Sequence, residues 1–318
     1  MSNIIYTDNS KFSSMICDTK ALLRHHHGLA AVGDEPAYFT AGRAAHESHA
    51  VWLRGGSPEE ALAKFRADYA GVAPADPSDR LSYENTSTIL RAWYETHPRE
   101  MLPFAVERPE HVEVGFQVPL AEDDGTQFVF YGRADAIVRC KRTGRWMVLD
   151  HKHPGWVRSV PGGRSYFDAF RNDSQMSGYV WAAQQTLGEP VAGIWINAIE
   201  FSRLPGSTEP NTKCRTHGLR YAECRTEHVH SEMREFTRTP GQLAAWHTNA
   251  VALAKRYAAL TREYPALADV KRAGQQGTFY HACVNCDFAA FCEAERPVQW
   301  ADGMLASRPW RPFAEGES

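Results

Sequence analysis

The sequence predicts a mixed α/β fold, and three observations carry this prediction. Apolar residues in the N-terminal third recur at helical spacing. Residues 111–150 alternate between apolar and polar, as half-buried strands do. A helix at 165–187, a strand at 191–199 and a helix at 240–264 then follow. We therefore expect one mixed core rather than two independent domains.

Three helices are expected before residue 100. Ser57, Pro58 and Glu60 suit the N-cap, N1 and N3 positions of one helix, and apolar residues follow it at helical spacing. Residues 40–53 and 81–96 have the same periodicity. The N-terminal third should therefore be largely helical.

The middle of the chain should form three or four meandering strands, at 111–118, 127–131, 134–138 and 146–150. A basic turn at 141–144 precedes the last of them. The polar stretch 205–227 is expected to be a long connection after the strand at 191–199. A capping-box pattern at Thr239-Pro240-Gly241-Gln242 opens the final helix.

Composition excludes several classes of protein. The chain has 318 residues, of which 43% are hydrophobic, enough for a buried core and too many for a disordered chain. The net charge of −3 excludes a generally basic nucleic-acid coat but allows a local basic groove. No apolar run is long enough to span a bilayer or to form an export signal, so we expect a cytoplasmic protein without a membrane partner.

Two carboxylates and a lysine form the most informative group. Asp150 and Lys152 stand two residues apart at a strand end, so both project to one side, and Asp135 can meet them from a neighbouring strand. Two converging carboxylates suit Mg²⁺ or Mn²⁺. A lysine beside them can orient a water and stabilise charge on a phosphate. Taken alone, the same residues also suit an ordinary turn or cap.

Two helical features extend this group. His46 follows Gly42 on an expected helix, where a lone histidine is usually structural. Gln175 and Tyr179 are four residues apart on the helix after Lys152, so they share one face. An ordinary helix with Tyr179 in the core would have the same pattern.

Four short motifs, in their order along the chain, resemble those of the RecB-type branch of the PD-(D/E)xK nuclease superfamily. They are Gly42-x3-His46, Gly132-x2-Asp135, Asp150-x-Lys152 and Gln175-x3-Tyr179. Cys17 followed by Cys283-x2-Cys286-x5-Cys292 resembles its iron–sulfur subgroup. That subgroup includes AddB-type helicase–nuclease domains, CRISPR adaptation exonucleases and phage exonucleases.

The resemblance implies a restriction-endonuclease-like mixed central sheet flanked by helices, with an iron–sulfur cluster joining the N-terminal helical region to the C-terminal segment. It implies one nuclease domain over 1–318, with a helical part (1–105), a catalytic core (106–202) and a C-terminal helical and cluster part (203–318). The implied metal ligands are His46, Asp135, Asp150 and the main-chain carbonyl of His151. Lys152 would be the catalytic lysine, and Gln175 and Tyr179 would position it or the DNA. Asp150 stands where this family often has Glu.

The seven cysteines argue against a complete disulfide framework because their number is odd. By spacing alone, Cys17, Cys283, Cys286 and Cys292 suit a [4Fe–4S] cluster and a tetrahedral Zn²⁺ equally, and unrelated buried thiols are a third interpretation. The resemblance favours the cluster. Either site would staple residue 17 to the C-terminal segment, so a mainly structural role is expected.

A second zinc site is a further interpretation, and it would draw on Cys214 and Cys224 with His217, His228 and His230 nearby. Cys140 is expected to be an ordinary thiol. These cysteines play no part in the resemblance.

A basic window surrounds the proposed metal site in the sequence. Residues 139–171 hold eight Lys or Arg against two Asp, a net charge of +6. Trp156 and Tyr166 could stack on bases of a single strand, and Arg158, Arg164 and Arg171 could contact phosphates. Alternatively, each of these residues is a solvated loop residue without a role in DNA binding. The acidic residues between Glu107 and Asp124, Glu113 among them, should lie away from the DNA.

The first hypothesis is a Mg²⁺- or Mn²⁺-dependent deoxyribonuclease. The resemblance implies an exonuclease that acts on DNA ends or single strands in phage or prokaryotic recombination or DNA processing. The chain has no Gly-x4-Gly-Lys-Ser/Thr loop, so unwinding would need a helicase partner. The second hypothesis is a non-catalytic DNA- or partner-binding module that keeps the fold and the cluster. A zinc-stabilised protein with coincidental motifs is the third.

Overall fold

The computed structural model describes residues 3–33, 36–157, 165–204, 213–214, 218–274, 283–284, 286–295 and 305–308. Its contacts divide the chain into two compact units, and neither is a continuous stretch of sequence. Unit 1 combines Met1–Asp34, Gly115–Gly132 and Pro240–Ser318, and unit 2 combines Glu35–Val114 and Arg133–Thr239. The single domain with parts 1–105, 106–202 and 203–318 stays a prediction.

Three helices begin unit 2: α3 (Ala37–Leu53), α4 (Pro58–Tyr69) and α5 (Tyr83–Thr96). The capping box expected at Ser57 is confirmed. The Ser57 side chain accepts from the Glu60 N–H, and the Glu60 carboxylate accepts from the Ser57 N–H at 2.7 Å. The Ser82 hydroxyl accepts from the Asn85 N–H and caps α5, which covers most of the expected range 81–96.

The strands of unit 2 form a mixed sheet. The strand β5 (Thr126–Cys140) belongs to unit 2 only from Arg133 onward. In unit 2, β3 (Phe104–Ala105) and β6 (Trp146–Lys152) lie antiparallel to that part of β5, β7 (Val191–Ile199) lies parallel to β6, and β8 (Ser231–Thr237) is antiparallel to β7. This confirms the expected mixed α/β class. β5 is one continuous strand where two were expected, and β8 is a strand that the sequence pattern did not indicate.

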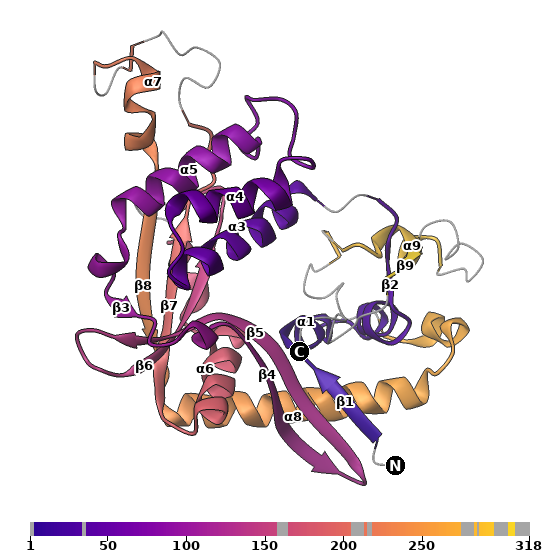
Figure 1. Ribbon diagram of the computed structural model, residues 1–318. Coiled ribbons are helices and arrows are strands. Elements are labelled where there is room, and N and C mark those ends of the chain that lie inside the picture. The colour runs from indigo at the N-terminus through magenta and orange to yellow at the C-terminus, as the bar shows by residue number, and fades with distance from the viewer. Residues whose placement is uncertain are drawn as a thin grey trace. The chain divides into compact units, whose positions relative to one another are not determined.

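Helices cover the sheet of unit 2 on its two faces. Alternate residues of β5 and β6, among them Ala136, Val138, Met147 and Leu149, pack with apolar residues of α3, α4 and α5 in one core. Figure 1 shows these three helices side by side. The next helix, α6 (Ser174–Leu187), packs against β6 and β7.

The helix expected at 165–187 is divided. A short 3₁₀ turn covers Tyr166–Phe170, and α6 starts only at Ser174. The reason is local, because the Asp173 side chain accepts a hydrogen bond from the Met176 N–H and thus acts as a new N-cap.

Unit 1 has its own core around α8 (Pro240–Glu263), whose expected span of 240–264 is confirmed. β1 (Asn3–Thr7) lies parallel to the first residues of β5, and β2 (Leu29–Ala31) is antiparallel to β9 (Leu305–Ser307). The remaining elements are α1 (Asn9–Ser14), α2 (Asp18–Ala21), a π-helical turn (Leu22–His26), a 3₁₀ turn (Leu267–Arg272) and α9 (Ala289–Glu293).

A tight hairpin joins β4 (Val112–Asp123) to β5. Its two turn residues, Asp124 and Gly125, have φ values of 46° and 69°. Positive φ at both positions suits the twist of a two-residue hairpin, and Asp-Gly is a favoured pair there. Among the helices that the structure describes, none combines the length and apolarity that a membrane span requires.

Candidate active site

Three elements of unit 2 bring the predicted site residues together: α3 carries His46, β5 carries Asp135, and β6 carries Asp150 and Lys152. The β5–β6 register pairs Ala136 with Leu149, so one residue further along Asp135 lies opposite Asp150. The alternation of side chains along β6 then sends Asp150 and Lys152 to the same face. The juxtaposition expected from the spacing is therefore present.

Each carboxylate of this group has a cationic or N–H partner. Asp135 Oδ2 lies 2.9 Å from His46 Nδ1 and accepts a hydrogen bond of 2.6 Å from the His151 backbone N–H. Asp150 Oδ2 lies 2.8 Å from Lys152 Nζ. Asp150 is only 2% exposed, so bulk water does little to stabilise its charge and Lys152 is the cation beside it.

The pKa values of these groups follow from burial and from the pairing. Burial alone would raise the pKa of Asp135, but His46 and the His151 N–H hold it well below its usual value. Burial opposes the charge on His46 and on Lys152, yet Asp135 raises the pKa of His46 and Asp150 raises that of Lys152. For Asp150 burial wins over Lys152, so its pKa is raised. The metal-free site thus holds an ionised Asp135 and a firmly charged Lys152.

Three further histidines lie behind the site. The rings of His49 and His151 stack with centroids 4.0 Å apart, and those of His49 and His153 stack at 5.3 Å. Burial lowers the pKa of all three, to about 3 for His151. They are therefore neutral at physiological pH, whereas the pKa of His46 is shifted in the opposite direction.

Hydrogen bonds define which nitrogen of His49 carries the proton. The Ser48 hydroxyl donates to the Ala61 carbonyl at 2.7 Å, so the Tyr94 hydroxyl must donate to Ser48. His49 Nδ1–H then donates to the Tyr94 oxygen. That leaves His49 Nε2 as the acceptor for His153 Nε2–H, 3.1 Å away. The network fixes both rings next to the strand end that holds Lys152.

On α6, Gln175 and Tyr179 meet as expected from their spacing. Gln175 Nε2 donates to the Tyr179 hydroxyl at 3.0 Å. Burial raises the pKa of Tyr179, and its hydroxyl interacts electrostatically with Asp150 and Lys152. Both side chains therefore belong to the surroundings of the lysine.

Glu113 is a member of the site that the sequence did not indicate. Its carboxylate lies 2.8 Å from Arg133 Nε, and its side chain is 9% exposed. Burial and the charge of Asp135 raise the pKa of Glu113 to about 7, although Arg133 and His46 oppose the shift. Its φ of 56° is left-handed, which is rare for a residue other than glycine. Glu113 therefore lies close to the site residues, and the prediction that its acidic segment lies away from the DNA stays a prediction.

The residues expected to contact DNA differ in their exposure and in their partners. Trp156 is 42% exposed and free to stack on a base. Tyr166 is half-buried, and its hydroxyl interacts electrostatically with Lys152 and Asp150. Arg171 is exposed and pairs with Asp168 at 3.0 Å. Arg158 and Arg164 lie outside the described residues.

Half of the basic window lies at the other end of the β5–β6 hairpin. The turn at 141–144 is one strand length, roughly 15 Å, from Asp150. Arg139 pairs with Glu107 at 2.8 Å, and Lys141 Nζ donates to the Glu100 carbonyl at 2.7 Å. The expectation that the whole window surrounds the site is therefore wrong, because residues adjacent in the sequence separate along a hairpin.

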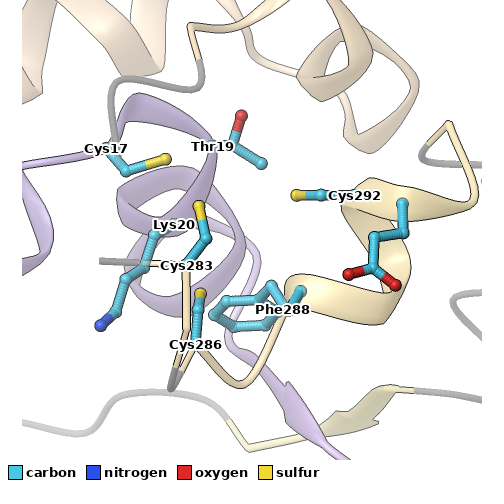
Figure 2. A pocket seen from close by; sticks show the side chains of 9 residues that line it. Cys17, Thr19, Lys20, Cys283, Cys286, Phe288 and Cys292 are labelled. Carbon is cyan, nitrogen blue, oxygen red and sulfur yellow. The ribbon is translucent and has the colours of Figure 1, made fainter. Parts of the chain in front are cut away.

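In unit 1 the four cysteines expected to bind a cluster line one pocket of about 260 Å³. Cys17 precedes α2, Cys283 and Cys286 form a turn, and Cys292 lies on α9. Figure 2 shows the four thiols around this pocket, with Lys20 and Phe288 beside them. Four sulfur donors around one cavity are a donor set that suits a [4Fe–4S] cluster or Zn²⁺.

Comparison with known proteins identifies the family of the chain. The sequence profile of the PD-(D/E)XK nuclease superfamily matches residues 13–293. The chain therefore belongs to the PD-(D/E)XK nuclease superfamily. No curated protein matches the sequence. A crystal structure of a candidate exonuclease from Eubacterium rectale is similar with a TM-score of 0.49 and 11% identity, over 90% of this chain and 87% of that one.

Proposed function

We propose that the protein is a Mg²⁺- or Mn²⁺-dependent deoxyribonuclease that degrades DNA from its ends or as single strands. The observation that carries the proposal is the meeting of Asp135 and Asp150 on paired strands, with His46 and Lys152 against them. The superfamily to which the chain belongs supports nuclease activity. The preference for exonucleolytic action rests on the resemblance of the motifs to RecB-type enzymes.

The donor atoms fit a divalent cation. His46, Asp135, Asp150 and the carbonyl of His151 would hold it, because carboxylate and carbonyl oxygens with one imidazole suit Mg²⁺ or Mn²⁺. When bound, such an ion polarises the scissile phosphate and lowers the pKa of an attacking water. His46 must lose its proton to ligate, since the charged ring has no lone pair to offer at that nitrogen.

Lys152 acts as a donor rather than as a base in this proposal. Its pKa is raised by Asp150 despite burial, so the ammonium stays charged at neutral pH. A charged ammonium can orient the attacking water through the water's oxygen and stabilise negative charge on the phosphate. Gln175 and Tyr179 lie on α6 beside Lys152, and they would restrict the position of the lysine side chain.

The pocket of Cys17, Cys283, Cys286 and Cys292 would hold a [4Fe–4S] cluster, with Zn²⁺ as the alternative. The donors come from both ends of the sequence, so ligation would close a very long loop and stabilise unit 1. A structural role follows from this arrangement. No chemical step at the active site needs it.

For DNA binding, we propose that Trp156 and Tyr166 stack on bases and that Arg171 contacts the backbone. Arg158 and Arg164 are proposed for the same purpose from the sequence alone. A cytoplasmic role in phage or prokaryotic DNA processing, with a separate helicase, completes the proposal.

The test is an anaerobic assay on end-labelled single-stranded, double-stranded and circular DNA with Mg²⁺ or Mn²⁺. Wild type should shorten linear DNA progressively and leave circles intact. Asp150→Ala should abolish cleavage, whereas Asp68→Ala, a surface carboxylate on α4 paired with Lys64, should not. DNA binding without cleavage by folded wild type would instead favour a non-catalytic binding module.

A further inference from the structure

The connection between β7 and β8 brings two cysteines and a histidine together, remote in sequence from the four thiols of the unit 1 pocket. Cys214 Sγ lies 3.4 Å from His228 Nε2, and Cys224 Sγ lies 3.7 Å from the same nitrogen. All three ligand atoms lie within 4.8 Å of one another. Cys214 and Cys224 are 2% and 0% exposed.

The backbone is arranged to present these side chains. The Cys214 N–H donates to the Leu219 carbonyl at 2.7 Å and the Gly218 N–H donates to the Cys214 carbonyl at 2.8 Å, which closes a tight loop. Gly218 takes a φ of +68° in that loop, a conformation that glycine adopts readily. Cys214 therefore faces the segment that follows the loop.

Helical geometry aligns the other two ligands. Cys224 ends α7 (Tyr221–Cys224), and His228 ends the 3₁₀ turn Arg225–His228. Cys224 Sγ and His228 Nε2 lie 3.7 Å apart, so the two side chains meet on one side of these consecutive turns. The segment is anchored as well, because Arg225 Nη1 lies 2.8 Å from Glu84 Oε1 on α5.

The distances are those of ligands sharing one zinc ion. Zn–S bonds of about 2.3 Å and Zn–N bonds of about 2.0–2.1 Å at a tetrahedral angle place sulfur and nitrogen roughly 3.6 Å apart. The two observed separations, 3.4 and 3.7 Å, bracket that value. Thiolate and imidazole ligands favour zinc over Mg²⁺ or Mn²⁺.

We propose that Cys214, Cys224 and His228 bind a structural Zn²⁺ that fixes the β7–β8 connection on α5. Ligation ties residue 214 to residues 224 and 228, and the Arg225–Glu84 ion pair ties the same segment to the helix. The fourth coordination position belongs to a water or another side chain. His230 follows closely in the sequence, and His217 lies outside the described residues.

The test is the zinc content of the purified full-length chain by elemental analysis. Wild type and Cys140→Ser should carry the same zinc, because Cys140 is a buried thiol of unit 2 on β5. Cys224→Ser and His228→Ala should each lose one equivalent. The Cys283→Ser background must give the same difference, which separates this site from the thiols of unit 1.

X-ray absorption at the zinc edge keeps the test decisive if a variant fails to fold. In the otherwise intact Cys283→Ser protein, a shell of two sulfurs near ~2.3 Å with nitrogen near ~2.0–2.1 Å supports the site. Equal zinc in all variants, a sulfur-only shell, or a Cys214–Cys224 disulfide in metal-free protein would overturn it. Nuclease activity with Mg²⁺ should survive in any folded Cys224→Ser protein.

Discussion

His46 Nδ1 lies 2.9 Å from Asp135 Oδ2, which joins helix α3 to strand β5 at the centre of the candidate site. The same carboxylate oxygen also accepts the backbone N–H of His151. A proton on His46 is therefore stabilised by Asp135, and it would compete with any metal ion that these two side chains bind.

The first prediction is that Mn²⁺ binding strengthens as pH rises. Asp135 raises the pKa of His46, so the proton competes with the metal up to that higher value. Below it, affinity should change by up to about tenfold per pH unit, because one proton is released. Calorimetric titration from pH 5.5 to 8 measures this. His46→Asn should flatten the dependence, and His26→Asn, an exposed histidine of unit 1, should not.

The contribution of His46 to the stability of the metal-free protein should decrease as pH rises, in contrast to its effect on metal affinity. Because the folded-state pKa of His46 is raised, its contribution is complete below about pH 6.5 and is lost as pH rises through the folded value. The lowered pKa of Asp135 adds stability above about pH 3.9, which is lost on acidification. Because burial lowers the pKa of His49, His151 and His153, these rings act in the opposite direction, so the test compares wild type with His46→Asn. A difference in urea midpoint between the two proteins that stays constant from pH 6 to 8 without metal would contradict the His46–Asp135 pair.

The second prediction concerns the histidine network. Tyr94→Phe removes the hydroxyl between Ser48 and His49 and leaves buried polar groups without a partner. We expect a loss of about 1–3 kcal/mol in the free energy of unfolding. Tyr38→Phe on the same unit is the control, because Tyr38 is 52% exposed. Equal midpoints for the two variants in urea would show that the network contributes nothing.

The third prediction is that Glu113 supports the metal site. Glu113→Gln removes a carboxylate that interacts with Asp135 and His46 and that pairs with Arg133. Loss of such an outer partner should weaken Mn²⁺ affinity or activity roughly 10- to 100-fold. Glu110→Gln, an exposed neighbour, is the matched control. Unchanged affinity and activity in folded Glu113→Gln would remove Glu113 from the site.

The fourth prediction separates the cysteine pocket from the chemistry. Cys292→Ser should lose the brown colour and iron of anaerobically purified protein and should destabilise unit 1. The thiols come from Cys17 and from the segment after residue 282, so unit 1 loses its long-range tie. Cys140→Ser should keep both iron and stability. Iron that persists in Cys292→Ser would exclude Cys292 as a ligand.

Much of the site follows from local rules that the sequence makes visible. Strand alternation places Asp150 and Lys152 on one face, and a hairpin sets Asp135 opposite Asp150. The i, i+4 spacing of Gln175 and Tyr179 holds in α6. In each case a fixed periodicity and a short sequence separation determine the contact.

Other features depend on tertiary packing and left no such signal. Glu113 has a left-handed φ, and its carboxylate interacts with Asp135. No pattern in the sequence predicts that backbone conformation. The residues of β8 are half-buried from Ser231 to Phe236 and exposed at Thr237, so the strand lacks the alternation of buried and exposed positions that identifies a strand. The stack of His49, His151 and His153 joins α3 to the end of β6, far apart in sequence.

The measurement that tests the central claim most directly compares DNA cleavage by wild type, Lys152→Ala and Lys64→Ala, with Mn²⁺ binding measured on each. Lys64 is a surface lysine paired with Asp68 at 2.8 Å. Lys152→Ala should still bind Mn²⁺ and DNA but cut roughly 100- to 1,000-fold more slowly, because the charge facing the phosphate is gone. Lys64→Ala should match wild type. Cleavage at the wild-type rate by Lys152→Ala would contradict the assignment of this site as the nuclease centre.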